Sequence, residues 1–155
     1  MNALTRHLSA PAGPDPVDGS RPAIAPCTRI GDIVLTSGQT AHLDGANVAN
    51  GQVPVDVDLL TARSAAWQCA RNAIAALATA IELDDVVEVV RMTVFIASHK
   101  DFTEQHIVAD AATAYLQYVF GTEIGIHTRS AIGVAALPTG STVEVEVAVR
   151  VRPGS

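Results

Sequence analysis

The sequence has 155 residues, of which 48% are hydrophobic, so one ordinary domain can bury its core without the help of metals or disulfides. Its formal net charge of -6, with 10 Lys and Arg against 16 Asp and Glu, argues against binding to nucleic acid or to anionic membranes. Because no apolar stretch is long enough to cross a membrane and the N-terminus lacks the pattern of a secretion signal, we expect a cytoplasmic protein.

The first part of the chain, residues 1–20, is predicted to be a flexible arm ahead of a single domain over residues 21–155. Pro, Gly, Ser and Asp dominate the stretch SAPAGPDPVDGS and prevent any regular period. Order is expected to begin with two short β-rich runs, AIAPCTRI and DIVLTSG, which Gly31 and Asp32 join as a hairpin. The following HLDGANVANG contains turn pairs and predicts a surface excursion.

Two helices and a central strand are predicted in the middle of the chain. One long amphipathic helix is predicted over residues 58–81, because apolar residues recur by threes, fours and sevens at Leu60, Trp67, Ala70, Ile74, Leu77 and Ile81. The run VVEVVRMTVFIAS, residues 86–98, is rich in β-branched residues and apolar on both faces, which is typical of a central strand. A capping box formed by Asp101 and Glu104 predicts the start of a second helix, and Gly121 predicts its end.

The last two strands are predicted to form a hairpin around the turn LPTGS. In TVEVEVAVRV the valines occupy every second position, which predicts a strand buried on one face only. If residues 130–136 pair with residues 142–148, Arg129 lies opposite Val149 and about 17 Å from Glu144 along the strand. Arg129 and Glu144 are then either surface charges or parts of a pocket. A small ligand shared by both would have to lie between subunits.

The order of these elements predicts an α+β fold of two layers, in which two α-helices cover one face of a mixed β-sheet. The helices leave the other face of the sheet free. In DIVLTSG, Ile33 and Leu35 lie on one side and Val34 on the other, so neither face of this strand is strongly polar. We therefore expect an oligomer that buries the free face.

Neither a metal site nor a disulfide is predicted. Cys27 and Cys69 are expected to be free thiols, because Cys69 falls among core positions of the first helix and nothing indicates an oxidising compartment. The five histidines are scattered without the spacing of metal ligands.

From about Pro22 to Arg150 the sequence resembles the RidA/YjgF family of reactive-intermediate deaminases. The matching stretches are DIVLTSGQT, VVEVVRMTVFIASHKDF and TRSAIGVAALPTGSTVEVEVAV, in the order of the family and at compatible spacings. The individual motifs are the family's SGQ, arginine-serine pair, leucine-proline turn and first glutamate of the terminal strand, which appear here as Ser37-Gly38-Gln39, Arg129-Ser130, Leu137-Pro138 and Glu144.

This resemblance implies a homotrimer of chorismate-mutase-like α+β subunits, with a cleft between each pair of neighbours. It also implies hydrolysis of small 2-imino or enamine acids, such as 2-aminoacrylate or 2-iminobutyrate, to 2-oxo acids and ammonia. Arg129 would grip the substrate carboxylate and Glu144 would activate a water molecule. Ser37 and backbone groups near Gly38 and Ala131 would bind the substrate or orient the water, and no metal or organic cofactor would be needed.

Three departures from the family bear on the shape of the pocket. The best-studied deaminases carry a tyrosine in the first strand, a cysteine two residues after the arginine and an asparagine at the start of the second helix. This sequence has Cys27, Ala131 and His106 there. His106 is either a group that titrates near neutral pH in the cleft or an exposed helix histidine. His127, two residues before the arginine, resembles a less characterised branch of the family, and it either lines the cleft or ends the loop.

Other functions stay open at this point. One is a non-catalytic trimer that binds 2-oxo acids or similar metabolites through Arg129, with Glu144 as a structural residue. Another is a deaminase of a different imine or enamine, such as 2-aminomuconate, for which Cys27 and Ala131 would leave a roomier cleft. Ribonuclease activity, a label common in the family, is disfavoured because an acidic chain with 4% aromatic residues offers little for phosphates or bases. The expected partners are a small carboxylate substrate and further copies of this chain, without nucleic acid or membrane.

Overall fold

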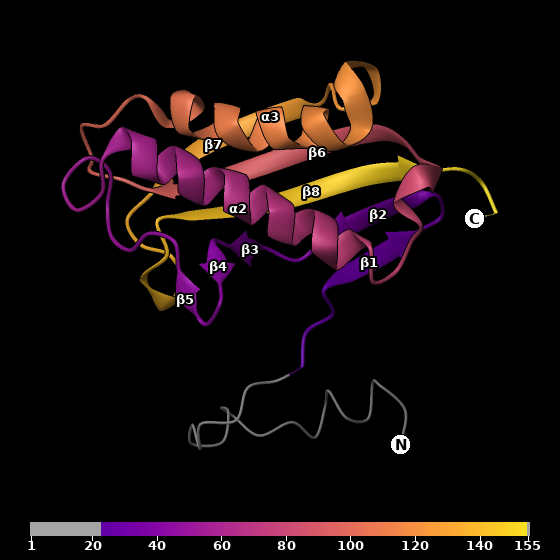
Figure 1. Cartoon of the computed structure of the whole chain (residues 1–155), viewed down its shortest axis with the longest axis horizontal. Helices are drawn as coiled ribbons and strands as arrows, with labels where there is room; N and C mark the ends of the chain where they lie inside the picture. Colours follow the sequence, from indigo (N-terminus) through magenta and orange to yellow (C-terminus); the bar gives the residue numbers. More distant parts are fainter. Residues whose placement is uncertain (1–22, 155) are drawn as a thin grey trace, which may run out of the picture.

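A mixed β-sheet covered on one face by two α-helices makes up residues 23–154, which are the residues described in this computed structural model (Figure 1). The predicted two-layer α+β fold is confirmed. The arm predicted over residues 1–20 lies outside the described residues. The elements in chain order are β1 (Cys27–Ile30), β2 (Ile33–Thr36), β3 (Gln39–Thr40), β4 (His42–Leu43), β5 (Ala46–Asn47), α2 (Leu59–Leu77), β6 (Val86–Ala97), α3 (Gln105–Ile124), β7 (Thr128–Val134) and β8 (Val143–Val151).

The strand order of the sheet is β1-β2-β8-β6-β7, and β3 also pairs with β8. The N-terminal hairpin is confirmed, since β1 and β2 pair antiparallel with Ile30 opposite Ile33. The hairpin predicted for residues 130–136 and 142–148 is wrong, because β7 pairs in parallel with β6, and β6 separates β7 from β8. The apolar β6 gains most from the central position between two strands. The connection through LPTGS is long enough to pass the end of β6 instead of turning back at once.

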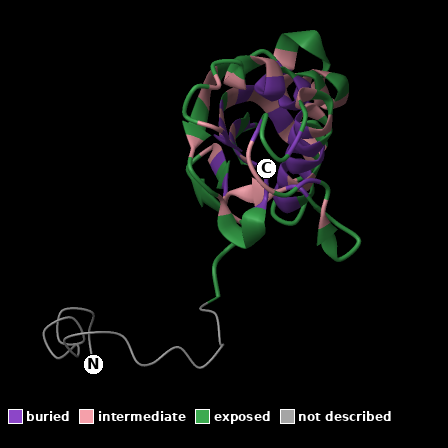
Figure 2. Ribbon diagram, turned by 90° about the vertical axis from the view of Figure 1, so that its left-hand side faces the viewer, coloured by how far each residue is buried: buried purple, intermediate pink, exposed green. Residues whose placement is uncertain are grey.

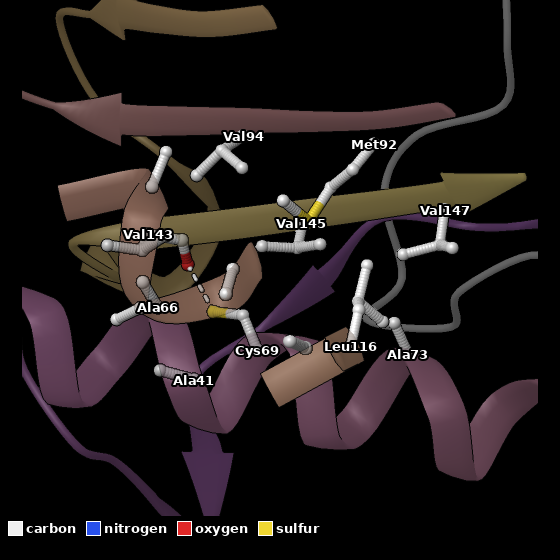
Figure 3. Close-up of a cluster of buried hydrophobic side chains, with 14 of the residues drawn as sticks. Ala41, Ala66, Cys69, Ala73, Met92, Val94, Leu116, Val143, Val145 and Val147 are labelled. Atoms are coloured by element: carbon white, nitrogen blue, oxygen red, sulfur yellow. Dashed lines mark hydrogen bonds between the residues drawn. The ribbon is translucent and has the colours of Figure 1, made fainter. Parts of the chain in front are cut away.

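The hydrophobic core lies between the sheet and the helices (Figure 2). The valines of β8 that begin with Val143 are at most 2% exposed, whereas Glu144 and Glu146 lie on the other side of the strand, so the predicted one-sided burial is confirmed. Cys69 of α2 is fully buried beneath this strand, and its thiol donates to the Val143 carbonyl oxygen at 3.1 Å (Figure 3). Burial raises the pKa of the Cys69 thiol far above its ordinary value. Neither this cysteine nor Cys27 forms a disulfide.

Helix α2 starts where the sequence predicts it, and the predicted apolar stripe is confirmed in part, since Ala70, Ile74 and Leu77 are buried. Asp58 caps it, because the side chain of this residue accepts a backbone hydrogen bond from the first turn. The regular helix ends at Leu77, one turn before the predicted end at Ile81. Leu60 and Trp67, which belong to the predicted apolar stripe, are 75% and 39% exposed. The buried positions of α2 are largely alanines, and these small side chains allow the helix to lie close to the sheet.

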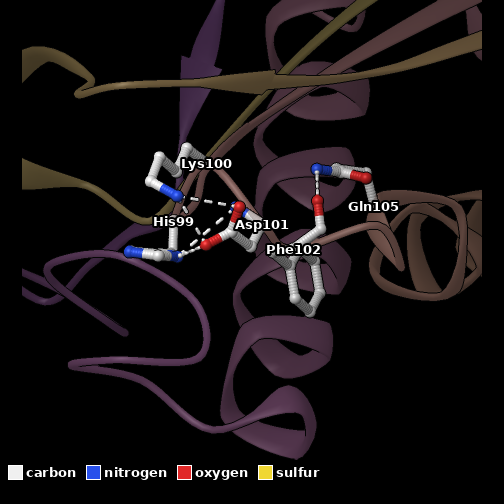
Figure 4. A network of polar contacts seen from close by, with 5 residues as sticks. All are labelled: His99, Lys100, Asp101, Phe102 and Gln105. Carbon is white, nitrogen blue, oxygen red and sulfur yellow. Dashed lines mark hydrogen bonds and ion pairs between the residues drawn. The ribbon is translucent and has the colours of Figure 1, made fainter.

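Helix α3 begins at Gln105, and the capping box predicted from Asp101 is wrong. The Lys100 ammonium group lies 2.7 Å from the Asp101 carboxylate and provides it with a charged partner. Gln105 folds back so that its side chain donates to the Phe102 carbonyl oxygen at 2.7 Å (Figure 4). Gly121, the predicted end of the helix, has a φ of 78° and interrupts the helix before a last short turn. The sequence therefore predicts the break correctly and the start incorrectly.

The face of the sheet that points away from the helices is uncovered in the described part of the chain. Leu35 on β2 and Ile132 on β7 are 36% and 41% exposed on this open face. Phe95 on β6 pairs with Ile132 and is only partly buried. An uncovered and partly apolar sheet face agrees with the expectation that another subunit packs on it. The homotrimer itself stays a prediction.

Candidate functional site

Glu144 extends from the open face of the sheet, near the beginning of β8. Its neighbours Val143 and Val145 turn to the core, so its carboxylate leaves the strand on the opposite side. Partial burial raises the pKa of the Glu144 carboxyl above its ordinary value of 4.5, and the nearby charge of Glu146 adds to the rise. Within residues 23–154 no group donates a hydrogen bond to this carboxylate. The carboxylate is therefore open to a water molecule or a ligand.

Ser37 and Gly38 hold the backbone of the β2–β3 loop against this carboxylate. Both polar groups of Ser37 serve the loop, because its N–H donates to the Pro26 carbonyl at 2.8 Å and its hydroxyl to the Ala25 carbonyl at 2.6 Å. A Cβ atom at Gly38 would overlap the Glu144 carboxylate, so a larger residue at this position would displace the carboxylate from its place. The structure thus brings Ser37, Gly38 and Glu144 together, with the Ser37 hydroxyl occupied in a structural role.

Arg129 lies on the edge strand β7 and points to the helix side of the sheet. It pairs in register with Met92, a fully buried core residue, and its guanidinium group reaches α3. Nη1 donates to Oγ1 of Thr113 at 2.8 Å and forms an ion pair with Asp110, whose Oδ1 lies 2.9 Å away. Nη2 is 3.4 Å from the carbonyl oxygen of His106. The Arg129 side chain is 22% exposed, so a largely buried cation is compensated within the same chain.

His127 supports this arginine through Thr113. Its Nδ1 lies 2.7 Å from the Gly125 carbonyl oxygen, and its Nε2 lies 3.2 Å from Oγ1 of Thr113. Because a carbonyl oxygen only accepts, Nδ1 carries the proton and Nε2 accepts the hydrogen bond of the Thr113 hydroxyl. Burial lowers the pKa of His127 below 6.5; the hydrogen bond to Gly125 opposes this effect and the charge of Arg129 adds to it. The ring is therefore neutral at pH 7.

Arg129 and Glu144 lie on opposite faces of the sheet. The register connects Arg129 through Met92 to Val147, and the side chains of Met92 and Val147 point into the core (Figure 3). Glu144 pairs with Phe95, three positions from Met92 along β6 and two strands from Arg129, or about 14 Å at the backbone. The expected distance of about 17 Å came from a hairpin pairing that is wrong. The conclusion drawn from it is unchanged, because one chain does not bring Arg129 and Glu144 to the same small ligand.

The remaining predicted site residues occupy separate places. Ala131 follows Arg129 on the same side of β7 and is half-buried. His106 is exposed at the start of α3, and its carbonyl oxygen rather than its ring contacts Arg129. Cys27 lies on β1, where its Sγ donates to a carbonyl oxygen near the end of α2 at 3.6 Å. Within the described residues the structure therefore groups His106 and His127 with the arginine and leaves Cys27 apart. A role of Cys27 in substrate binding stays a prediction.

Asp110 and Thr113 are the residues of this site that sequence reasoning missed. They lie about one turn apart on α3 and both contact Arg129. Their spacing reveals a shared helix face, but a helix face has many possible partners. Arg129 becomes the partner only when β7 runs parallel to β6 and comes to lie beneath α3. The spacing of Asp110 and Thr113 therefore identifies Arg129 as their partner only when the strand order is known, and the predicted pairing of β7 is wrong.

A cavity of about 420 Å³ lies beside the same edge strand, where β7 ends and α3 begins. Its walls include His99, Lys100 and Gln105 (Figure 4) together with Gly133. In the part of the chain that the structure describes, no group of three or more His, Cys, Asp or Glu side chains is arranged for a metal ion. Among these residues there is also no helix with the length and apolar character that a membrane crossing requires.

The fold and these residues define a class of protein: a two-layer α+β domain with a carboxylate on the open sheet face, lying against a glycine, and an arginine on the edge strand. The family model described as Endoribonuclease L-PSP matches residues 20–151. The chain therefore belongs to this family, which includes the YjgF/RidA proteins. The resemblance seen in the sequence is confirmed.

Individual relatives agree with this assignment. Protein TCP17 of Trypanosoma cruzi is 39% identical over 114 residues, which cover 73% of this chain and 71% of that protein. The crystal structure of Atu1372 from Agrobacterium tumefaciens, a protein of unknown function, has 34% identity and a TM-score of 0.78, covering 83% of this chain and 82% of that one. A Shewanella oneidensis structure that carries the name endoribonuclease has 26% identity and a TM-score of 0.80, covering 96% and 98% of the two chains.

Proposed function

We propose that this protein is a hydrolytic deaminase of small 2-imino and enamine acids, of the 2-aminoacrylate or 2-iminobutyrate type, that produces a 2-oxo acid and ammonia in the cytoplasm. It acts as a homotrimer, and each site combines Arg129 of one subunit with Glu144 of its neighbour. One observation carries the proposal: a partly desolvated carboxylate and an arginine lie on opposite faces of one sheet. They serve one substrate only if the open face of one subunit packs near the edge strand of the next.

The surroundings of Glu144 support its role as a general base. A carboxylate with a raised pKa holds a proton more readily than an exposed one, which favours proton transfer at neutral pH. Because position 38 is glycine, the carboxylate can lie directly against the loop backbone without a side chain at this position displacing it.

The surroundings of Arg129 support its role as the carboxylate grip. Its Nε has no hydrogen-bond partner within residues 23–154, and its Nη2 makes only the long contact with the His106 carbonyl. Nε and Nη2 together form one edge of the guanidinium group, which can bind both oxygens of a carboxylate. The substrate would thus be fixed through its one permanent negative charge.

The proposed reaction needs only water and these two side chains. Glu144 takes a proton from water while the water oxygen bonds to the imine carbon, and the electron pair of the C=N double bond moves to nitrogen. Glu144 then gives this proton to nitrogen. Glu144 next takes the proton of the new hydroxyl group and passes it to the amino nitrogen, the C–N bond breaks, and ammonia leaves with the bonding pair while the oxygen forms the carbonyl of the 2-oxo acid. An enamine first becomes the imine by gaining a proton on carbon and losing one from nitrogen.

Two alternatives have some support and a third has little. A non-catalytic binder of 2-oxo acids would use the open edge of Arg129 and leave Glu144 without a chemical role. A deaminase of a larger substrate such as 2-aminomuconate would use the room that the small side chain of Ala131, half-buried on the same side of β7 as Arg129, leaves in the cleft. Ribonuclease activity, which the family name suggests, agrees poorly with the net charge of -6 and the 4% aromatic content.

A coupled assay tests the proposal. A pyridoxal-phosphate dehydratase generates 2-aminoacrylate or 2-iminobutyrate, and the appearance of the 2-oxo acid is followed with and without this protein. We expect acceleration by the native protein, loss of acceleration and of 2-oxo acid binding in Arg129→Ala, and loss of acceleration with retained binding in Glu144→Gln. Catalytic groups of this kind contribute about 100-fold or more to a rate, so the loss should be clear.

Arg71→Ala is the matched control, because it removes an exposed arginine from α2. It should leave the rate unchanged. Binding without acceleration by the native trimer would favour the non-catalytic binder. Full activity of Arg129→Ala would contradict the assignment of the site.

A further inference from the structure

The Arg129 guanidinium group is held from one side. Nη1 donates to the Thr113 hydroxyl at 2.8 Å and lies 2.9 Å from the Asp110 carboxylate, with which it forms an ion pair. The opposite edge, formed by Nε and Nη2, has only the 3.4 Å contact to the His106 carbonyl oxygen within residues 23–154. A carboxylate is bound best through two parallel N–H groups on one edge. The contacts on Nη1 therefore determine which edge is offered to a ligand.

Thr113 is itself fixed in this arrangement. Its hydroxyl group accepts from Nη1 of Arg129 and donates to Nε2 of His127 at 3.2 Å. His127 in turn donates from Nδ1 to the Gly125 carbonyl oxygen at 2.7 Å. The chain of hydrogen bonds runs from the backbone at Gly125 to the guanidinium group without a break, so the position of the group is determined before any ligand arrives.

Asp110 differs from Thr113 because it brings a full negative charge. Its side chain is 54% exposed, whereas that of Arg129 is 22% exposed, so solvent screens the pair only in part. A ligand carboxylate that approaches the free edge meets a cation already paired with one anion. The attraction for the ligand is correspondingly weaker than that of an unpaired arginine, and a second negative charge on the ligand would be repelled by Asp110.

We infer that Asp110 is a positioning and specificity-determining residue of the Arg129 site, which selects monocarboxylates over dicarboxylates and keeps their binding weak. This inference rests on the proposed function only in naming imino acids as substrates. Asp110 directs the free edge of Arg129 to the ligand, and its charge limits the affinity. Weak binding suits an enzyme whose 2-oxo acid product carries the same carboxylate as its substrate, because the product must leave. The inference also places dicarboxylates such as 2-aminomuconate among the poor substrates.

The test compares Asp110→Asn with the native trimer. Calorimetric titration with 2-oxobutyrate, a monocarboxylate, should show binding about fivefold tighter in the variant, as expected for removal of a partly exposed charge next to a cation. Titration with 2-oxoglutarate, a dicarboxylate, should show a larger gain. In the coupled assay, the KM for 2-iminobutyrate should fall and inhibition by 2-oxobutyrate should become stronger, while kcat does not rise. Asp110→Glu, which keeps the charge, should stay close to the native protein.

Glu123→Gln is the control, because it removes an exposed negative charge from the same helix. It should change neither affinity. Unchanged or weaker binding of both oxo acids in Asp110→Asn, with a thermal midpoint like that of Glu123→Gln, would overturn the inference. The titrations do not depend on catalysis, so a native protein that binds oxo acids without hydrolysing imines would contradict the proposed function and leave the role of Asp110 intact.

Discussion

Glycine at position 38 and glutamate at position 144 form a pair that neither residue explains alone. A Cβ atom at Gly38 has no room beside the carboxylate, and the carboxylate has its raised pKa because protein surrounds it on the open face. The family resemblance names both residues from the sequence, but it gives no physical reason for them. The structure gives the reason: the backbone of the β2–β3 loop lies so close to the Glu144 carboxylate that a side chain at position 38 would occupy the same space.

The raised pKa of Glu144 makes a prediction about stability. Its folded pKa lies above the ordinary 4.5, so ionisation opposes folding: the native state is favoured below pH 4.5 and loses stability as the pH rises through the folded pKa. Glu144→Gln has no such loss. In an Arg129→Ala background, where no neighbouring arginine compensates the carboxylate, we expect Glu144→Gln to be more stable at pH 7 and equal near pH 4.

Urea unfolding at a series of pH values measures this difference. The same comparison of Glu144→Gln with Glu144 in chains that keep Arg129 tests whether the arginine of a neighbouring subunit faces Glu144. If it does, the arginine stabilises the carboxylate, and the substitution should raise the stability at pH 7 by less or should lower it. A Glu144→Gln variant that is less stable at pH 7 in the Arg129→Ala background would show that the carboxylate is not desolvated.

Local sequence patterns predict the strands and their buried faces but not all of their pairing. Alternating valines predict β8 and its buried face, and the apolar run of β6 predicts a central strand; both predictions are confirmed. The pairing of β7 was predicted incorrectly, because a short turn between two strands is the commonest local solution and says nothing of a third strand that can separate them. The contacts of Arg129 with Asp110 and Thr113 depend on that pairing. They could not be predicted without it.

Helix α3 offers a prediction at its break. Gly121 has φ 78° and ψ 166°, a conformation that essentially only glycine adopts. Gly121→Ala should therefore destabilise the fold by about 1–3 kcal/mol, although nothing lies within 4 Å of the added methyl group. Urea unfolding measures the effect. Ala114→Ser, an exposed change within the regular part of the same helix, should cost well under 1 kcal/mol.

The prediction would be contradicted if α3 became continuous through position 121 in Gly121→Ala, because the strained backbone conformation would then be avoided. In that case Gly121→Ala would be as stable as the native protein or more stable, because alanine favours a continuous helix over glycine.

The assembled molecule makes the most direct prediction about the site. If Arg129 and Glu144 come from different subunits, Arg129→Ala and Glu144→Gln chains expressed together should recover activity, although each alone is inactive. Random mixing in equal amounts joins an intact arginine and an intact glutamate in about a quarter of the clefts. Co-purification through both tags keeps only mixed trimers, each with one intact cleft in three, so the coupled assay should give roughly a third of the native rate.

Sedimentation of the same sample should give the mass of three subunits. A mixed trimer without activity would contradict a shared site, provided that native and variant chains mixed in the same way retain theirs. A chain carrying both substitutions is the control, because its mixture with either single variant cannot form an intact cleft.

The buried thiol of Cys69 can serve as a probe of local opening of the fold. This thiol is fully buried against Val143, on the strand that continues directly into Glu144. A thiol reagent can reach Cys69 only after α2 and β8 separate. The labelling rate of Cys69 therefore reports how frequently this local opening occurs. The rate at which α2 separates from β8 can thus be measured in the native protein, without denaturant and without knowledge of the substrate.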